Sequence, residues 1–436
     1  MASLLKKEAL LTRGSYYEAS VERAPAFSPL DGRIMADVCV VGGGYAGLSA
    51  ALELAARGYA VALLEAQRVG WGASGRNGGQ VIVGYGFGGE DAIEAQLPAE
   101  DVKRAWNITV EGVQLLRERI ITHAIDCDFV PGYLTLAVNA RKARALQARL
   151  SHMARAYDYP MQSIAPDDIG NWIASERFHG GAFDPQSGHL HPLKYCLGLA
   201  GAASAANVRI FENSAVIHLD QGGKPVVRTA QGEVVCDFVV LAGNVYLGEY
   251  SSTVAPELAP RIMPVGTYII ATERMAQERA NRLIRGRAAA SDTNHVLDYF
   301  RLSADGRMLF GGGESYSTTT PHNLAARIRQ RMLGVFPQLA DLSVTHTWGG
   351  FVDVTMNHAP DFGRLGNNIY YLQGFSGHGL ALAGMAGKLV AEAIAGQAER
   401  FDLLTRIKHR SFPGGALLRM PALVLGMLYY QLLDLF

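Results

Sequence analysis

A glycine-rich turn between two apolar runs constrains this chain more than any other feature. The residues DVCVVGGGYAGLSAALELAARGYAVALLEA, at 37–66, predict a strand, a tight turn, a helix and a second strand. Gly42, Gly44 and Gly47 match the G-x-G-x-x-G fingerprint, in which missing side chains let a pyrophosphate approach the start of the helix. Glu65 ends the second strand, where a carboxylate can accept hydrogen bonds from a ribose diol. The unit is predicted to bind an adenine dinucleotide, either FAD or NAD.

Two further glycine-rich segments favour FAD. GWGASGRNGGQ, at 70–80, follows the ribose-binding strand, and its backbone amides and Arg76 are expected to reach the phosphates and the flavin ring. A simple NAD domain has no use for this insertion. GFSGHG, at 374–379, precedes a small-residue helix whose N-terminus would stabilise negative charge at the pyrimidine edge of a flavin. His378 is expected either to face the ring or cavity, or to serve only the structure of its turn.

The length and the remaining pattern predict two interwoven domains. A chain of 436 residues exceeds one ordinary hydrophobic core. Alternating apolar residues between 262 and 310 predict an antiparallel sheet that walls a substrate cavity. The expected fold class is α/β, a Rossmann-like FAD-binding domain interwoven with an α+β substrate domain on a mainly antiparallel sheet. The expected boundaries are 32–90, 180–250 and 345–400 for the FAD-binding domain, 91–179 and 251–344 for the substrate domain, and 401–436 for an apolar C-terminal tail.

Composition and charge limit the partners. Lys and Arg together number 40, as do Asp and Glu, so no basic field suited to nucleic acid is expected and the partner should be a small molecule. The four cysteines are far apart and form no CxxC pair, which predicts buried thiols in a reducing compartment. The polar N-terminus does not resemble a signal peptide, and a cytoplasmic protein is expected.

The apolar tail, residues 416–436, leaves two alternatives open. It carries Arg419, Pro421 and Asp434, and its uninterrupted part is shorter than the roughly 20 residues of a spanning helix. A helix packed on the body or at an oligomer interface is expected, or else a peripheral contact with the inner membrane face.

Ten segments together carry a resemblance to a known family. They are SYYEAS, DVCVVGGGYAGLSAALELA, GWGASGRNGGQ, IDCDFVPGYL, SGHLHPL, VVLAGNVYLG, LDYFRLSADGRMLFGGG, NIYYLQGFSGHG, AERFD and FPGG. With them the chain is identified as a member of the D-amino-acid oxidase superfamily of FAD oxidoreductases, and it resembles the branch that oxidises gamma-glutamylputrescine. The likeness spans nearly the whole chain.

The resemblance implies FAD as the cofactor. Some relatives attach flavin to a cysteine just past a WGG-like segment, whereas WGGFVDVTMNHAPDFG, from Trp348, has none, so the flavin is expected to be non-covalent. The residues expected to bind it are Gly42, Gly43, Gly44, Tyr45, Ala46, Gly47, Glu65, Ala66, Gly72, Ala73, Ser74, Gly75, Arg76, Asn77, Gly78, Gly79, Gln80, Val216, Ala242, Gly243, Gly374, Gly377, His378, Gly379 and Leu380.

The resemblance also implies oxidation of a carbon next to an amine nitrogen. Arg301 lies about where relatives bind a substrate carboxylate, although a structural arginine is the equal alternative. Tyr299 and Phe300 alternate faces, so only one should line the cavity. Arg301, Tyr299 and His378 are the catalytic candidates. No general base is assigned, because positioning does most of the work in such an oxidation.

The sequence leaves alternatives for the amine substrate and for the electron acceptor, and it predicts no metal site. The chain departs from its relatives at GESYSTTTP, at FVDVTMNHA and at Trp71, which favours a related amine such as pipecolate, sarcosine or a D-amino acid as the alternative substrate. Dioxygen is the expected acceptor, and a membrane-associated dehydrogenase that reduces quinone is the alternative. His189 and His191 form an H-x-H pair without a third ligand nearby, so no metal is expected.

Overall fold

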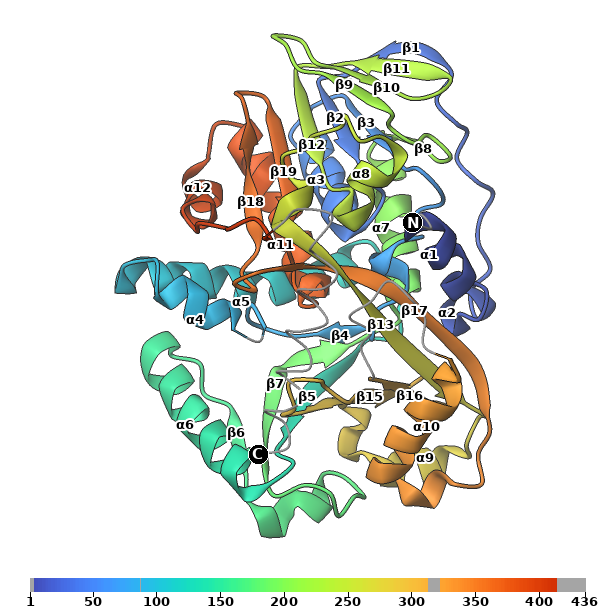
Figure 1. Ribbon diagram of the computed structural model, residues 1–436, viewed down its shortest axis with the longest axis vertical. Coiled ribbons are helices and arrows are strands. Elements are labelled where there is room, and N and C mark those ends of the chain that lie inside the picture. The colour runs from blue at the N-terminus through green and yellow to red at the C-terminus, as the bar shows by residue number, and fades with distance from the viewer. Residues whose placement is uncertain (1–3, 87, 313–321, 414–436) are drawn as a thin grey trace.

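The computed structural model describes residues 4–86, 88–312 and 322–413, and the chain builds three sheets (Figure 1). A six-stranded and a four-stranded sheet lie in the upper half of the view, and a nine-stranded sheet lies below them. The helices are α1 Leu4–Thr12, α2 Tyr16–Ala19, α3 Tyr45–Ala56, α4 Gly89–Glu94, α5 Ala99–Thr122, α6 Ala140–Tyr157, α7 Pro192–Ala205, α8 Leu247–Tyr250, α9 Gln277–Leu283, α10 Leu324–Val335, α11 Gly379–Ile394 and α12 Glu399–Thr405.

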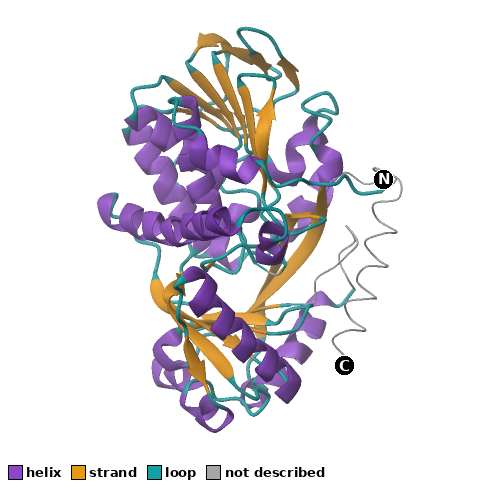
Figure 2. Ribbon diagram, turned by 90° about the vertical axis from the view of Figure 1, so that its left-hand side faces the viewer, coloured by secondary structure: helices purple, strands orange, loops and turns teal. Residues whose placement is uncertain are grey.

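The six-stranded sheet has the order β18-β19-β12-β2-β3-β8. All its pairs are parallel except β18 with β19. Helices α3, α7 and α11 cover one face of the sheet (Figure 2), and the four-stranded sheet packs on the other. Because both faces are buried, the strands read as continuous apolar runs. Its strands are β2 Val38–Val41, β3 Val61–Leu64, β8 Arg209–Phe211, β12 Phe238–Leu241, β18 Asp361–Leu365 and β19 Ile369–Gln373. The expected Rossmann-like βαβ unit, β2-α3-β3, is confirmed.

The nine-stranded sheet is mainly antiparallel, as expected. Its longest pair, β13 and β17, crosses the middle of the molecule from the upper sheets to the lower helices (Figure 1). The strands are β4 Gln80–Val81, β5 Val130–Leu136, β6 Gln162–Ile164, β7 Gly181–His189, β13 Ile262–Thr272, β14 Ala289–Asp292, β15 Tyr299–Leu302, β16 Met308–Gly311 and β17 Val344–Thr355. The small sheet comprises β1 Gly32–Met35, β9 His218–Asp220, β10 Val226–Arg228 and β11 Gly232–Val235.

Sheet membership differs from the expected domain boundaries at three strands. The expected FAD-binding domain includes β4, β7 and β17, but all three belong to the nine-stranded sheet, in which β4 pairs with β7, β7 with β5 and β17 with β13. The cause is that a strand's partner is fixed by tertiary pairing, which its own residues do not reveal. The expected tail from residue 401 is also wrong at its start, because α12 buries Phe401 completely in the main core. Residues 414–436 lie outside the described residues.

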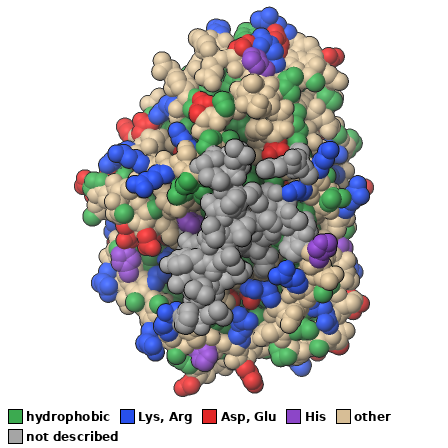
Figure 3. Space-filling view, viewed as in Figure 1, with side chains coloured by type: hydrophobic (Ala, Val, Ile, Leu, Met, Phe, Trp, Pro, Cys, Tyr) green, Lys and Arg blue, Asp and Glu red, His purple; other side chains and the backbone are tan. Residues whose placement is uncertain are grey.

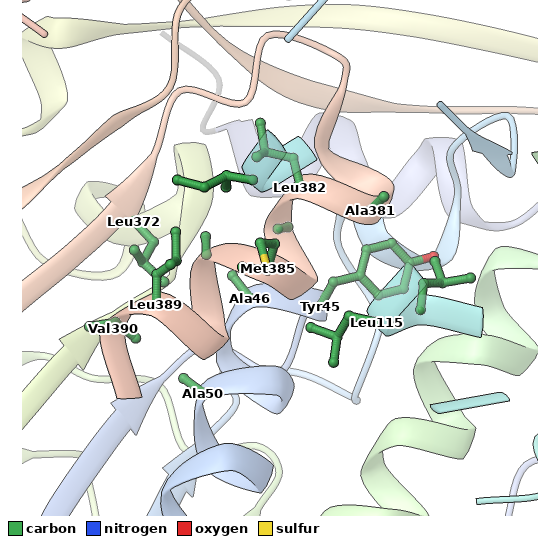
Figure 4. Packing of buried hydrophobic residues seen from close by; sticks show 14 of the residues in the cluster. Tyr45, Ala46, Ala50, Leu115, Leu372, Ala381, Leu382, Met385, Leu389 and Val390 are labelled. Atoms are coloured by element: carbon green, nitrogen blue, oxygen red, sulfur yellow. The ribbon is translucent and has the colours of Figure 1, made fainter. Parts of the chain in front are cut away.

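Helices α3 and α11 cross with their backbones in contact. A Cβ on Gly387 would lie 2.5 Å from the Ala50 nitrogen and 2.6 Å from the Ala46 oxygen, so this position admits only glycine without rearrangement. Met385 and Leu389 of α11 lie beside Ala46 and Leu372 in the same core (Figure 4). The close crossing brings the N-termini of both helices to one side of the molecule.

The surface and the thiols agree with the composition. Basic and acidic side chains are interspersed on the face shown in Figure 3. Each of the four cysteines, Cys39, Cys127, Cys196 and Cys236, is buried as a free thiol, as expected. Within the described ranges no single helix is both long and apolar enough to cross a membrane; α11 and α12 pass that test only as a pair bent by 118°.

Candidate functional site

A cavity of about 720 Å³ lies between the six-stranded and the nine-stranded sheet. The turns after β2, β3 and β12 form one wall, at the carboxyl ends of parallel strands where open α/β sheets bind ligands. Strands β13, β15 and β17 contribute to the opposite wall. The volume is within the usual range for a ligand or cofactor pocket.

The first wall is built around the turn before α3. Gly42 has a φ of +112° and packs so closely on β12 that a Cβ would lie 2.5 Å from the Ala242 oxygen. α3 begins after Gly44, which has no side chain to cap the helix, and the first N–H of the helix, that of Tyr45, donates to Ser74 Oγ at 3.1 Å. The other N–H groups at this helix start and the positive end of the helix dipole suit a phosphate.

Glu65 is part of the same wall and contacts the turn before α3. Its Oε2 accepts from the Gly43 N–H at 2.7 Å and its Oε1 accepts from the Gln67 N–H at 2.9 Å. Burial raises the pKa of Glu65, and the two backbone hydrogen bonds oppose that rise. Each carboxylate oxygen keeps a further lone pair, so Glu65 can still accept from a hydroxyl in the cavity.

The 70–80 segment folds over the cavity as a compact loop. Asn77 ties the loop together, because its Nδ2 donates to the Ala73 oxygen at 3.0 Å and its Oδ1 accepts from the Gly79 N–H at 2.8 Å. Trp71, Ser74 and Asn77 all line the cavity.

Arg76 does not reach the cavity. Its Nη1 lies 2.5 Å from Glu8 Oε1 in a fully buried ion pair, and its Nη2 donates to the Trp71 oxygen. The expectation that its guanidinium contacts phosphates or flavin is therefore corrected: the cation is bound by Glu8 behind the loop and by the backbone of the loop itself.

Arg301 is also turned away. Its Nε donates to the Gly78 oxygen at 2.6 Å and its Nη2 donates to Tyr17 Oη at 3.0 Å. The guanidinium is buried and is not part of the cavity wall, so the expected grip on a substrate carboxylate is replaced by the structural alternative. Tyr299, on the same face of β15, does line the cavity, while Phe300 packs in the core beside Phe310.

The start of α11 forms the second helix terminus at the cavity. Gly377, Gly379 and Leu380 line it, and no side chain caps the first N–H groups of the helix. Asp353, on β17, holds the preceding turn by accepting from the N–H groups of Gly374 and Phe375. Burial raises the pKa of Asp353 to about 7.

His378 lies at this terminus with its ring packed against Gly86. A Cβ on Gly86, where φ is +87°, would lie 2.7 Å from His378 Nδ1. Burial lowers the pKa of His378, so the neutral ring is favoured. The side chain lines the cavity and also packs against the Gly86 loop, a position compatible with either of the expected roles.

The structure places most of the expected cofactor residues on the cavity wall. Those that line it are Gly42, Gly43, Gly44, Tyr45, Ala46, Glu65, Ala66, Gly72, Ala73, Ser74, Asn77, Gly78, Gln80, Val216, Ala242, Gly243, Gly377, His378, Gly379 and Leu380. Four glycines do not, and each instead permits a close approach behind the wall: Gly47 to Gly42, Gly75 to Gly70, Gly79 to Leu190 and Gly374 to Thr355.

Sequence reasoning missed the residues at the far end of the cavity. Met263, Val265 and Thr267 repeat with period two on β13, a signal that could have identified them. The others follow no period and come from the middle of β5, the helical turns after β12, and loops: Tyr133, Asn244, Tyr246, Tyr250, Asn294, His295, Leu297, Met356 and His358. Two of the three expected departures from the relatives, Trp71 and the segment from Phe351, contribute to the wall; the third, the GESYSTTTP segment at 313–321, lies outside the described residues.

His189 and His191 have separate structural partners. His189 Nε2 contacts the Arg287 oxygen at 2.8 Å. His191 caps α7 by accepting from the Lys194 N–H, and its Nε2 contacts Ser20 Oγ at 3.0 Å. β7 ends at His189, so the two rings do not share a strand face. Among the residues that the structure describes, no three His, Cys, Asp or Glu side chains group as metal ligands.

Comparison with known proteins identifies the family. Residues 37–393 match the family described as FAD dependent oxidoreductase (DAO). The chain belongs to this family. The expected membership of the D-amino-acid oxidase superfamily and the expected FAD-dependent oxidoreductase are thus confirmed.

Relatives match over nearly their full length. The chain is 41% identical to a gamma-glutamylputrescine oxidoreductase of Escherichia coli (strain K12) over 96% of this chain and 98% of that protein. It is also 41% identical to a probable oxidoreductase OrdL of Haemophilus influenzae, over 96% of this chain and 97% of that protein.

Solved structures confirm the fold class. Glycine oxidase from Geobacillus kaustophilus superposes with a TM-score of 0.70 at 19% identity, over 83% of this chain and 95% of that chain. L-proline dehydrogenase from P. horikoshii superposes with a TM-score of 0.69 at 21% identity, over 86% of this chain and 94% of that chain.

The residues on the cavity wall fit FAD. The starts of α3 and α11, whose N-cap residues make no side-chain cap, face the same cavity, and their N–H groups suit a pyrophosphate and the pyrimidine edge of a flavin. Glu65 lines the cavity just past β3, and the turn at Gly42 leaves no room for a side chain. A Rossmann-like fold uses such a turn and such a carboxylate to hold a dinucleotide.

Proposed function

We propose that the protein oxidises the primary amine of gamma-glutamylputrescine to gamma-glutamylaminobutyraldehyde, with ammonia and hydrogen peroxide as the other products. The observation that carries this proposal is the full-length similarity, at 41% identity, to the gamma-glutamylputrescine oxidoreductase of Escherichia coli. A pipecolate-, sarcosine- or D-amino-acid-type oxidase is the competing substrate class within the same family.

The geometry of Arg301 supports an amine without an adjacent carboxylate. An amino-acid oxidase needs a cation beside the reacting carbon to bind the substrate carboxylate. Arg301 is instead committed to the Gly78 oxygen and Tyr17 Oη. The far end of the cavity presents Tyr133, Tyr299 and the apolar face of β13. These groups suit the carbon chain of a diamine.

The chain's own residues position and desolvate the substrate. Bound FAD supplies a hydride acceptor, and the lone pair of the neutral amine assists hydride transfer from the adjacent carbon. The imine formed from the substrate hydrolyses in water to the aldehyde and ammonia. Asp353 holds the α11 terminus, whose N–H groups would face the developing negative charge. Tyr299 is placed to contact the substrate, and no residue is assigned as a general base.

We propose that FAD is held without a covalent bond. No cysteine is among the described residues that line the cavity, and the four cysteines of the chain are buried elsewhere. Acid precipitation of the purified protein should release all its flavin into the supernatant. Flavin that stays with the pellet would contradict this.

Anaerobic reduction of the enzyme-bound flavin tests the substrate. Gamma-glutamylputrescine, putrescine, pipecolate, sarcosine and D-alanine are each mixed with the FAD-loaded protein, and the loss of flavin absorbance is followed. We expect fast bleaching by gamma-glutamylputrescine alone, then peroxide on admission of air. Bleaching by another amine would overturn the substrate. Slow reoxidation in air with fast reoxidation by a quinone would overturn dioxygen as the acceptor.

The tail and the location of the protein remain predictions. Residues 414–436 are outside the described residues, and either an oligomer interface or a peripheral membrane contact is expected of them. Cell fractionation at low salt without detergent tests this: a cytoplasmic protein without membrane contact stays wholly in the supernatant.

A further inference from the structure

The first residues of the chain form a separate layer behind the cavity. Residues 4–23, here called the N-terminal strap, comprise α1, α2 and the turn to Arg23. They precede residue 37, where the family match begins. α1 packs on β17, and at Gly14 the strap approaches so closely that a Cβ would lie 2.2 Å from the Thr347 oxygen. The strap is therefore fixed to the nine-stranded sheet.

The first contact of the strap with the 70–80 loop is the Glu8–Arg76 ion pair. Both side chains are buried, with 0% and 3% of their surface exposed, and Glu8 Oε1 lies 2.5 Å from Arg76 Nη1. The Arg76 guanidinium also lies 4.8 Å from the centroid of the Trp71 ring, which lines the cavity. A carboxylate on α1 thus fixes the cation against which a cavity aromatic packs.

The second contact runs from Tyr17 through Arg301 to the loop backbone. Tyr17 is completely buried, and its Oη accepts from Arg301 Nη2 at 3.0 Å. Arg301 Nε donates to the Gly78 oxygen at 2.6 Å, and Gly78 lines the cavity. The Tyr17 hydroxyl therefore orients the guanidinium that holds this end of the loop.

A third contact lies at the start of the loop. Arg23 Nη1 donates to the Val69 oxygen at 2.9 Å, while Glu18 binds the same guanidinium. The strap is thus connected to the loop near residues 69, 76 and 78, at its beginning, middle and end.

We propose that the N-terminal strap sets the position of the 70–80 loop for FAD, with Glu8 and Tyr17 as positioning residues. This inference rests on the proposed role of the loop as an FAD contact and is independent of the amine substrate. Neither residue lines the cavity, so each acts through an arginine. Removing Glu8 leaves Arg76 buried without its counter-charge, and the loop must shift to resolvate it.

FAD binding to the apoprotein is the direct test. Dissociation constants are measured by quenching of flavin fluorescence for Glu8→Gln, for Tyr17→Phe and for the matched control Tyr16→Phe. Tyr16 is on the same helix, but its Oη donates to Asp305 and makes no hydrogen bond to Arg76 or Arg301. We expect about tenfold weaker FAD binding for both variants and no change for the control. Glu8→Gln removes the counter-charge of the buried Arg76, and Tyr17→Phe removes an acceptor of the Arg301 guanidinium.

Two measurements separate positioning from general destabilisation. The visible circular dichroism of the bound flavin reports its surroundings and should change in Glu8→Gln and Tyr17→Phe at saturating FAD. Arg76→Gln combined with Glu8→Gln should bind FAD no more weakly than Glu8→Gln alone, because the pair acts as a unit. Tyr17→Phe removes one oxygen atom and keeps the test available if Glu8→Gln fails to fold.

The variant Ser74→Asp separates a failure of the strap proposal from a failure of the proposed role of the 70–80 loop in binding FAD. It places a carboxylate at the Tyr45 N–H, where a phosphate is expected, and should abolish FAD binding. If it does so while both strap variants bind FAD like the unmodified protein, the strap proposal is overturned and the role of the loop stands. If none of the three weakens FAD binding, the proposed role of the loop is overturned.

Discussion

At the scale of single residues, the direction of the Arg76 and Arg301 side chains depends on which hydrogen-bond acceptors lie within reach. Tyr299 and Arg301 share a face of β15, yet only Tyr299 reaches the cavity. The Arg301 guanidinium donates instead to the Gly78 oxygen and to Tyr17 Oη. Arg76 is redirected by Glu8 in the same way. These three acceptors lie far from their arginines in sequence, so the residues around each arginine could not predict the direction of its side chain.

Arg301→Met separates the structural role from substrate binding. The variant leaves the Gly78 oxygen and Tyr17 Oη without their donor, which should lower the free energy of unfolding by about 2–4 kcal/mol. The KM for the amine, measured at saturating FAD, should stay within about threefold of its original value, because Arg301 is not on the cavity wall. A KM raised a hundredfold with unchanged stability would restore the carboxylate-binding role.

Asp353 gives a pH dependence with a defined sign. Burial, and then the nearby Asp361, raise its folded-state pKa to about 7, against about 3.9 in an unfolded chain. Between these values the folded protein binds more protons, so this group's contribution to stability falls as the pH rises and the loss is complete above pH 7. Relative to Asp353→Asn, the unmodified apoprotein should lose roughly 2–3 kcal/mol of unfolding free energy between pH 5 and pH 8.

Urea unfolding of both apoproteins across this range measures the difference. Parallel stability profiles would mean that the Asp353 carboxyl stays ionised throughout.

At the scale of elements, glycine spacing and apolar period were sufficient for the parts that are local. They predicted β2, α3 and β3, the β19–α11 turn and the long strand β13, and these are confirmed. They did not predict that β7 and β17 join the nine-stranded sheet, because pairing is a property of two distant segments. They also missed Asn294 and His295, which lie in a loop without periodicity.

The crossing of α3 and α11 gives a matched pair of glycine variants. Gly387→Ala places a Cβ 2.5 Å from the Ala50 nitrogen, so the helices must separate, at a cost of about 1–3 kcal/mol. Gly384→Ala places its Cβ 3.6 Å from Arg119 Nη1, an ordinary contact, and should gain up to about 1 kcal/mol of helix propensity.

Thermal midpoints and FAD affinity check this pair. Separation of the helices also shifts both termini at the cavity, so only Gly387→Ala should bind FAD more weakly. Equal effects of the two variants would contradict a glycine-dependent crossing.

At the scale of the whole molecule, the cavity is shared by two sheets that contribute different chemistry. The turns of the six-stranded sheet supply N–H groups and Glu65, and the nine-stranded sheet supplies Tyr299 and the β13 face. A ligand that fills this cavity contacts both halves of the protein. FAD should therefore stabilise both, and not only the half that carries the glycine fingerprint.

Removal of FAD tests this coupling. At a free FAD concentration 100 times its dissociation constant, binding should add about 2.7 kcal/mol to the free energy of unfolding, and the thermal midpoint should rise with FAD concentration. Hydrogen exchange should slow in the 70–80 loop and also in β13 and β17, because their side chains line the same cavity. Protection limited to the loop and α3 would mean that the nine-stranded sheet binds only the substrate, and that FAD does not hold the two halves together.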